Sequence, residues 1–255
     1  MKNIRFISLI LLFLTAILPA QNKEIGLEDL WNGTFRTKGM QSLHSMANGK
    51  EYSVLSGNAI DIYDYKTLSK TRTLVSASDL NDVGRFLDYT FSNDESKVLL
   101  ATDFEYVFRH SRLGIYYVYD INTKTVSKIS ENKIQEPTFS PDGNKIAYGH
   151  NNNLYVKDLK SGTTTQITHD GQKNKIINGI TDWVYEEEFG FVRAFDWNAD
   201  GTKIAFIRFD ESNVPEFSMD VYGNQLYPTQ YTFKYPKAGE ANSVVSLHLY
   251  DVVSN

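Results

Sequence analysis

Short apolar runs separated by polar turns make up most of the chain beyond residue 40. The runs are rich in Tyr, Val, Ile, Phe and Thr, and the turns are rich in Asn, Asp and Gly. No long stretch of this region places apolar residues at helical spacing. The alternation predicts many short antiparallel strands.

One turn pattern occurs four times, at residues 44–50, 91–97, 139–145 and 197–203. Each copy begins with an aromatic residue or His and ends in Lys, and successive copies begin 47, 48 and 58 residues apart. In such a turn Pro fixes φ, Asp bonds its own backbone and Gly accepts a positive φ. A strand-like run follows each copy: Glu51–Leu55, Val98–Ala101, Ile146–Tyr148 and Ile204–Ile207.

A repeat of about 45 to 50 residues with four strands per unit is typical of a β-propeller. The chain has room for about four such blades, each a four-stranded antiparallel sheet. A β-sandwich with coincidental turns is the alternative. Because a propeller protects its strand edges by closing its ring, we expect these blades to belong to a larger ring.

The longest repeat contains about ten surplus residues, and these fall near residues 181–189. Apolar residues at 180, 183, 184, 185 and 189 fit a short helix better than a strand. Either Thr181 or Asp182 could cap its beginning. We therefore predict an all-β propeller interrupted by one short helical insertion.

The predicted helix carries a run of three carboxylates, Glu186, Glu187 and Glu188. A run of like charges is usually a solvated face, which is the alternative interpretation. Here the aromatic rings of Trp183, Tyr185 and Phe189 would hold the segment in place. A fixed cluster of carboxylates suits a cationic group of a ligand.

The composition argues against several other kinds of site. The net charge is −5 and no basic block occurs, so no nucleic-acid partner is expected. The chain has no cysteine, which excludes disulfides, thiolate metal sites and cysteine nucleophiles. No two of the five histidines have a metal-ligand spacing, so we expect neither a metal nor another cofactor.

Residues 1–20 have the features of a secretory signal peptide. Lys2 and Arg5 precede the nearly all-apolar segment Phe6–Leu18, and Ala20 precedes a polar stretch. The apolar segment is short for a membrane span, which needs about 20 residues. A buried first helix is the alternative. We expect cleavage after Ala20 and export to the periplasm or the medium, with soluble and envelope-attached forms both left open.

The segment 182–189 closely resembles the double-glutamate motif of dipeptidyl peptidase IV, in the prolyl oligopeptidase superfamily, in the form found in Bacteroidetes. Further similar segments cover the chain from about residue 24 to its end: 27–31, 178–181, 209–216 and 235–242. The turn repeats are shared by many propellers and are weaker signals. The resemblance implies that residues 24–255 are the first part of a propeller of eight blades.

The resemblance also implies an activity and a set of binding residues. Enzymes of this family are serine peptidases that release dipeptides from free N-termini, with Pro or Ala in second place. The two glutamates that hold the α-ammonium of the substrate match Glu187 and Glu188. The arginine that binds the carbonyl of its first residue matches Arg109, which by itself would be an ordinary surface arginine. Trp183, Tyr185 and Glu186 would support these residues.

The catalytic Ser, Asp and His of the family lie in a C-terminal α/β-hydrolase domain, and no Gly-x-Ser-x-Gly motif occurs in this chain. We therefore expect no catalytic residue here and no activity from these 255 residues alone. The family also implies a homodimer formed through an arm at Val214–Pro236, for which an ordinary hairpin is the alternative. Two other functions stay open: a non-catalytic periplasmic binding propeller, or a prolyl tripeptidyl peptidase.

Overall fold

The computed structural model describes residues 24–37, 39–81 and 83–254. The expected signal peptide at residues 1–20 lies outside these residues. The chain divides into two units, Met1–Gln41 and Ser42–Asn255. In the first unit a short helix, α2 (Leu27–Trp31), occupies one of the family-like segments. The second unit contains the strands and helix α3 (Trp183–Phe189).

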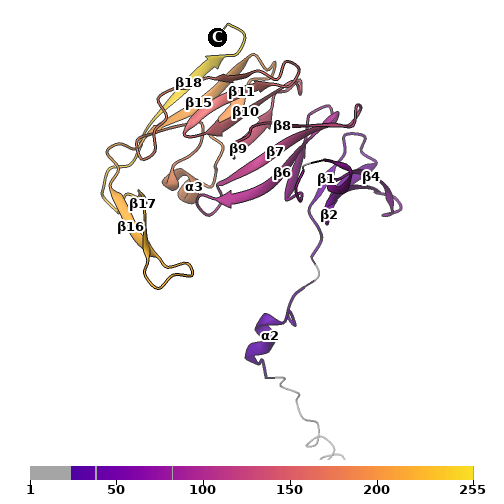
Figure 1. Ribbon diagram of the computed structural model, residues 1–255, viewed down its shortest axis with the longest axis horizontal. Helices are drawn as coiled ribbons and strands as arrows, with labels where there is room; N and C mark the ends of the chain where they lie inside the picture. Colours follow the sequence, from indigo (N-terminus) through magenta and orange to yellow (C-terminus); the bar gives the residue numbers. More distant parts are fainter. Residues whose placement is uncertain (1–23, 38, 82, 255) are drawn as a thin grey trace, which may run out of the picture. The chain divides into compact units, whose positions relative to one another are not determined.

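Four antiparallel sheets follow one another along the second unit (Figure 1). Blade 1 consists of β1 (Leu43–Ser45), β2 (Glu51–Ser56), β3 (Ala59–Asp64) and β4 (Lys70–Ser76), and the 3-10 helix η1 (Ala77–Asp79) follows it. Blade 2 consists of β5 (Asp88–Phe91), β6 (Lys97–Tyr106), β7 (Arg112–Asp120) and β8 (Thr125–Lys128). Blade 3 consists of β9 (Gln135–Phe139), β10 (Lys145–His150), β11 (Asn153–Asp158) and β12 (Thr164–Gln166). Blade 4 consists of β13 (Ile176–Asn178), β14 (Phe195–Trp197), β15 (Lys203–Asp210) and β18 (Val244–Asp251).

The repeated turn forms the hairpin between the first and second strands in blades 1 to 3, and joins β14 to β15 in blade 4. In blade 3 the Ser140 N–H donates to the Lys145 carbonyl over 2.8 Å, which closes the hairpin. Asp142 accepts hydrogen bonds from the Ser140 hydroxyl and the Asn144 N–H, and Gly143 has φ of +67°. The predicted turn chemistry is thus confirmed, and so are the four-stranded sheets of blades 1 to 3. In blade 4 the segments β13 and β14 are two parts of one strand, so the described residues give it three strand positions.

The hydrophobic core lies between consecutive blades. One cluster joins Ile60 and Ile62 of blade 1 to Val98 and Leu100 of blade 2. Leu99, which lies between Val98 and Leu100 on the same strand, belongs instead to a second cluster, between blades 2 and 3. A third cluster fills the space between blades 3 and 4. Because side chains alternate along a strand, each middle sheet buries both of its faces, as propeller blades do and as the two sheets of a sandwich do not.

Helix α3 belongs to an excursion, residues 180–193, that interrupts one strand of blade 4. Both β13 and β14 pair with β15, so that Asn178 lies opposite Arg208 and Phe195 opposite Phe206. Between them Gly179 donates to the Ile207 carbonyl, and the Ile207 N–H donates to the carbonyl of Ala194. The excursion therefore leaves and re-enters the sheet at a single step of the ladder. It accounts for the long repeat.

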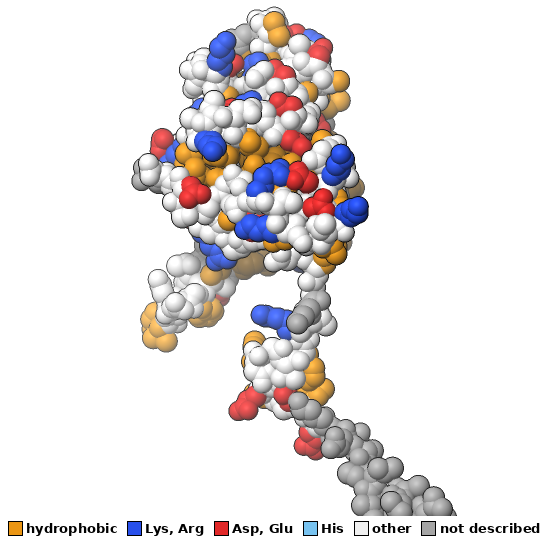
Figure 2. Space-filling view, turned by 90° about the vertical axis from the view of Figure 1, so that its right-hand side faces the viewer, with side chains coloured by type: hydrophobic (Ala, Val, Ile, Leu, Met, Phe, Trp, Pro, Cys, Tyr) orange, Lys and Arg blue, Asp and Glu red, His pale blue; other side chains and the backbone are white. Residues whose placement is uncertain are grey.

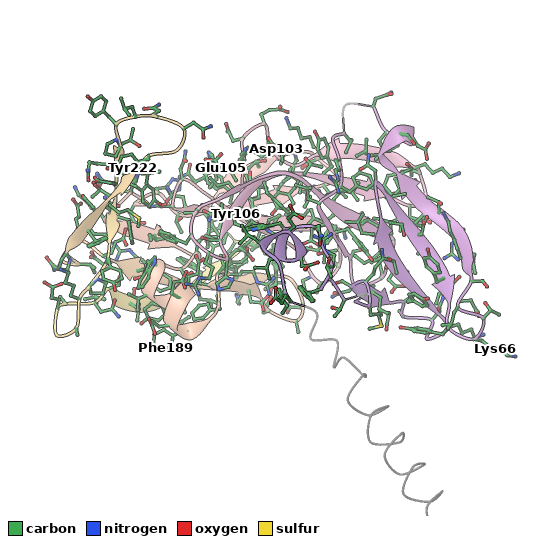
Figure 3. All side chains as sticks on the ribbon, turned by 90° about the horizontal axis from the view of Figure 1, so that it is seen from below. Lys66, Asp103, Glu105, Tyr106, Phe189 and Tyr222 are labelled. Atoms are coloured by element: carbon green, nitrogen blue, oxygen red, sulfur yellow. The ribbon has the colours of Figure 1, made fainter. Side chains whose placement is uncertain are left out.

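A hairpin of β16 (Glu216–Val221) and β17 (Thr229–Lys234) connects β15 to β18; we call residues 214–236 the arm. The arm projects from the blades, and Tyr222 marks its outer turn in Figure 3. Figure 2 shows hydrophobic side chains at its end. Leu226 and Tyr227, in the turn between β16 and β17, are both exposed. Within the described residues, β18 pairs only with β15. No helix of the described part of the chain is both long and apolar enough to cross a membrane.

Candidate functional site

The sequence around helix α3 explains where this helix begins and ends. The Asp182 carboxylate accepts a hydrogen bond from the Tyr185 N–H over 2.9 Å and caps the N-terminus. Gly190 ends the helix with φ of +74°, a conformation that a glycine adopts without strain. Of the two predicted caps, Asp182 takes that role. Thr181 instead closes the base of the excursion through hydrogen bonds to the Val192 and Phe191 carbonyls.

Aromatic contacts hold helix α3 on both sides. The Trp183 ring meets the edge of the Tyr235 ring with centroids 4.5 Å apart, and the Tyr185 ring packs against the buried Phe209 at 5.0 Å. The sequence also assigned an anchoring role to Phe189, but that residue lies on the surface and stacks only on Tyr185 (Figure 3). Two of the three aromatic residues therefore fix the helix.

The hairpin between β6 and β7 carries Arg109 at its end, and we call residues 107–111 the hairpin tip. Regular pairing of the two strands ends at Tyr106 and Arg112. Beyond this point the Val107 N–H donates to the Ser111 carbonyl, and the Phe108 N–H donates to the Ser111 hydroxyl. The Arg109 side chain projects outward and is 74% exposed.

Glu186 joins helix α3 to the hairpin tip. Its Oε1 accepts hydrogen bonds from the His110 N–H over 2.6 Å and from the Ser111 N–H over 2.9 Å. The Glu186 side chain is fully buried, and its Oε2 has no hydrogen-bond partner within the described residues. Two segments more than 70 residues apart in the sequence are thus connected at the residues that directly follow Arg109.

Glu187 is the second connection between these segments. Its Oε2 lies 3.3 Å from Nε of Arg109, and its side chain is only 11% exposed. Glu188 is exposed and makes no ion pair or hydrogen bond within the described ranges. Consecutive helical residues point in different directions, which explains why only one of the two carboxylates reaches Arg109.

The three predicted binding residues therefore lie on two neighbouring segments. Arg109 and Glu187 are in direct contact, and Glu188 follows Glu187 with its carboxylate open to solvent. Both glutamates belong to the last turn of the helix, where backbone carbonyls without helical partners add negative charge. Two carboxylates, Glu187 and Glu188, lie beside the one guanidinium of Arg109. The surplus negative charge favours a cation at the exposed side of the cluster.

The arm contributes contacts that the sequence did not reveal. The Phe233 ring lies 5.9 Å from the Phe108 ring, and the Tyr231 hydroxyl donates to the Val107 carbonyl over 3.4 Å. The arm also supplies Tyr235, the partner of Trp183. The arm therefore packs against both segments of the site. The run of aromatic residues in the arm was the only signal of these contacts in the sequence. In the sequence analysis that segment was interpreted as a dimer contact.

A cavity of about 470 Å³ lies beneath these contacts, bounded by the arm, the hairpin tip and blades 3 and 4. Glu211 borders this cavity and is buried. Burial, helped by the negative charge of Asp182, raises the pKa of Glu211 to about 7. In the sequence, Glu211 lies between Asp210 and Ser212 and resembles part of an ordinary polar turn, so its burial could not be predicted.

No cluster of three or more His, Cys, Asp or Glu that could hold a metal ion occurs within the described residues. The charged groups of the site have a binding chemistry of their own. Carboxylates bind ammonium groups through charge-assisted hydrogen bonds, and a guanidinium binds carbonyl or carboxylate oxygens.

Comparisons with known proteins agree with the propeller. Residues 92–255 match the family described as "Dipeptidyl peptidase IV (DPP IV) N-terminal region". The crystal structure of Porphyromonas gingivalis dipeptidyl peptidase 4 superposes with a TM-score of 0.85 and 40% identity, over 91% of this chain and 34% of that one. Prolyl endopeptidase FAP from Homo sapiens is 34% identical over 233 residues, and the Bos taurus protein is 33% identical over the same length.

The aligned region covers 90% of this chain but 30% of each mammalian protein. The chain therefore spans about a third of the length of its relatives. The match to the family extends over residues 92–255, well over half of the chain, and includes the α3 excursion and the arm. The chain belongs to the dipeptidyl peptidase IV family and represents its N-terminal propeller region.

Proposed function

We propose that this chain is the substrate-anchoring part of a secreted serine exopeptidase that releases Xaa-Pro and Xaa-Ala dipeptides from peptide N-termini. Glu187 and Glu188 bind the α-ammonium of the peptide, and Arg109 binds the carbonyl oxygen of its first residue. The supporting observation is the 3.3 Å contact between Arg109 and Glu187, beside the exposed carboxylate of Glu188.

The arrangement suits a free peptide N-terminus. An ammonium has three donors, and two carboxylates accept them with charge assistance. Glu187 is held by Arg109, while Glu188 has no competing partner among the described residues and can turn towards the ligand. Glu187 thus offers a fixed oxygen and Glu188 an adjustable one.

Fixed anchors would also set the length of the product. Two extended residues span about 7 Å, at roughly 3.3 to 3.6 Å per residue. A nucleophile that distance from the ammonium site would cut after the second residue. Holding the peptide in this register also brings the scissile bond close to the nucleophile, which contributes strongly to the rate.

The nucleophile would come from the C-terminal hydrolase domain of the full-length protein. This chain spans only about a third of its relatives, so hydrolysis is proposed for the full-length enzyme. The chain by itself would bind peptides weakly and hydrolyse nothing. A complete chain that binds peptides without cleaving them would instead support the binding-module interpretation.

The test uses the full-length enzyme and a Gly-Pro chromogenic substrate. We expect Glu187→Gln and Glu188→Gln each to lower kcat/KM at least about thirtyfold, because each removes a charge-assisted contact. Glu105→Gln is the matched control, since Glu105 is an exposed carboxylate on the β6–β7 hairpin that carries Arg109 (Figure 3). An acetylated N-terminus should abolish cleavage. Wild-type turnover by both site variants would refute the anchoring role.

The products distinguish the proposed enzyme from a related one. Mass spectrometry of a digested peptide with Pro at positions two and three should detect the dipeptide. Release of a tripeptide would identify a prolyl tripeptidyl peptidase. The value of kcat/KM should also fall above pH about 8, because the α-ammonium of the substrate loses its proton there.

The arm is our candidate for a homodimer contact. Its exposed hydrophobic residues lie on a two-stranded sheet, whose free edges could pair with a second copy. Sedimentation of the full-length protein with and without residues 222–228 tests this proposal. Export through the segment 1–20 is tested by N-terminal sequencing of the mature protein, which should begin at Gln21.

A further inference from the structure

We infer that Glu186 is a positioning residue that fixes the backbone of the hairpin tip so that Arg109 meets Glu187 and the substrate. This inference rests on the proposed function. It assigns to Glu186 a role distinct from that of Glu187 and Glu188, although the three glutamates are consecutive.

The burial of Glu186 excludes direct contact with a peptide. Its side chain is fully buried, whereas Glu188 is exposed and Glu187 borders the surface through its contact with Arg109. A buried carboxylate is costly unless polar partners compensate for the lost water. The only hydrogen-bond partners that the described residues give the Glu186 carboxylate are the N–H groups of His110 and Ser111. This carboxylate is therefore committed to the hairpin tip.

The hairpin tip needs such a partner. The regular β6–β7 pairing ends before it, and its own hydrogen bonds connect Val107 and Phe108 to Ser111. These bonds close the turn but do not join it to helix α3. Glu186 makes that connection at the two residues following Arg109, and Glu187 then pairs with the Arg109 side chain. Backbone and side chain of the tip are thus held by adjacent residues of one helix.

Two substitutions separate this role from that of a charged anchor. Glu186→Gln keeps an oxygen that can accept both N–H groups but removes the charge. Glu186→Ala removes the acceptor. We expect Glu186→Gln to keep kcat/KM within about fivefold of the wild type and Glu186→Ala to lose about thirtyfold, the effect of losing hydrogen bonds to a charged group. A residue that binds the ammonium by its charge would lose comparable activity in both variants.

A double-mutant cycle tests whether Glu186 acts through Arg109. In the full-length enzyme carrying Arg109→Ala, the additional substitution Glu186→Ala should lower kcat/KM by less than about twofold. Glu95→Ala is the matched control, because Glu95 also accepts a backbone hydrogen bond, from Ala47 over 2.6 Å, but between blades 1 and 2. This control should leave kcat/KM unchanged. Equal losses from Glu186→Ala with and without Arg109 would overturn the inference.

Hydrogen–deuterium exchange gives a readout that does not depend on catalysis. Amides in peptides covering residues 106–112 should exchange at least about tenfold faster in Glu186→Ala, and near the wild-type rate in Glu186→Gln. An unchanged rate in Glu186→Ala would refute the positioning role. If the wild-type enzyme released no dipeptide, the proposed function would fail, while the exchange experiment would still decide the role of Glu186.

Discussion

Replacing Glu211 with glutamine should stabilise the protein strongly at pH 8 and only slightly at pH 5. Glu211 is buried beside the cavity under the arm, where burial and the neighbouring carboxylate of Asp182 raise its pKa to about 7. In the unfolded chain its pKa returns to about 4.5. The folded protein therefore binds this proton more tightly than the unfolded chain.

The sign and size follow from linkage. A raised carboxyl pKa favours the folded state at low pH, and stability falls as the pH rises from about 4.5 through 7. With one pKa unit equal to about 1.4 kcal/mol, the full loss approaches about 3 kcal/mol above pH 8. About 2.5 kcal/mol of that loss falls between pH 5 and 8. Glutamine has the same size and no charge, so the variant should lose this dependence.

The assay is urea denaturation of the wild type and Glu211→Gln at several pH values from 5 to 8. The difference in unfolding free energy between the two proteins should grow steadily over this range. Asp182→Asn is an informative third protein, because asparagine also caps helices but does not repel the Glu211 carboxylate. It should shift the pH dependence to lower pH. A constant difference between wild type and Glu211→Gln would refute the reasoning.

Three further predictions concern the scaffold and the arm. Gly179→Ala should lower the free energy of unfolding by about 3 kcal/mol, because φ there is +71° and a Cβ would lie 2.6 Å from Leu154; an unchanged urea midpoint would contradict this. Asp94→Ala should lower the free energy of unfolding by about 1 kcal/mol at pH 7. The hydrogen bond from the Ser92 hydroxyl lowers the pKa of Asp94 to about 2. In acid titrations the stability difference between the variant and the wild type should therefore disappear as the pH falls from about 4 to 2. Phe233→Ala should raise KM several-fold in steady-state assays, since its ring supports the hairpin tip; an unaltered KM would exclude that support.

The elements that the sequence predicts well are those formed by local chemistry. The turn at residues 139–145 has its aromatic residue, Pro, Asp and Gly in the order that a hairpin needs, and the hydrogen bonds of Asp142 follow from this order. The helix predicted near residues 181–189, with Asp182 as one of two candidate caps, likewise matches α3 at Trp183–Phe189 within two residues. Interactions within about five residues along the chain are readable without a structure.

Contacts between distant segments could not be read in this way. Nothing in the sequence joins Glu186 to His110, because that hydrogen bond depends on how blades 2, 3 and 4 are arranged. Arg109 was selected only through the family resemblance, since an isolated arginine carries no signal of its partner. The surface position of Phe189 was also unpredictable, because a helix of two turns can bury either of two faces.

The way the α3 excursion joins blade 4 separates the loop from the scaffold that carries it. Gly179 and Ala194 both hydrogen-bond to Ile207 of β15, although fourteen residues lie between them in the chain. Residues can therefore be added to or removed from this loop without shifting a single strand partner elsewhere in the blade. A propeller of this kind can therefore change the reach and charge of this one loop while its blades stay the same.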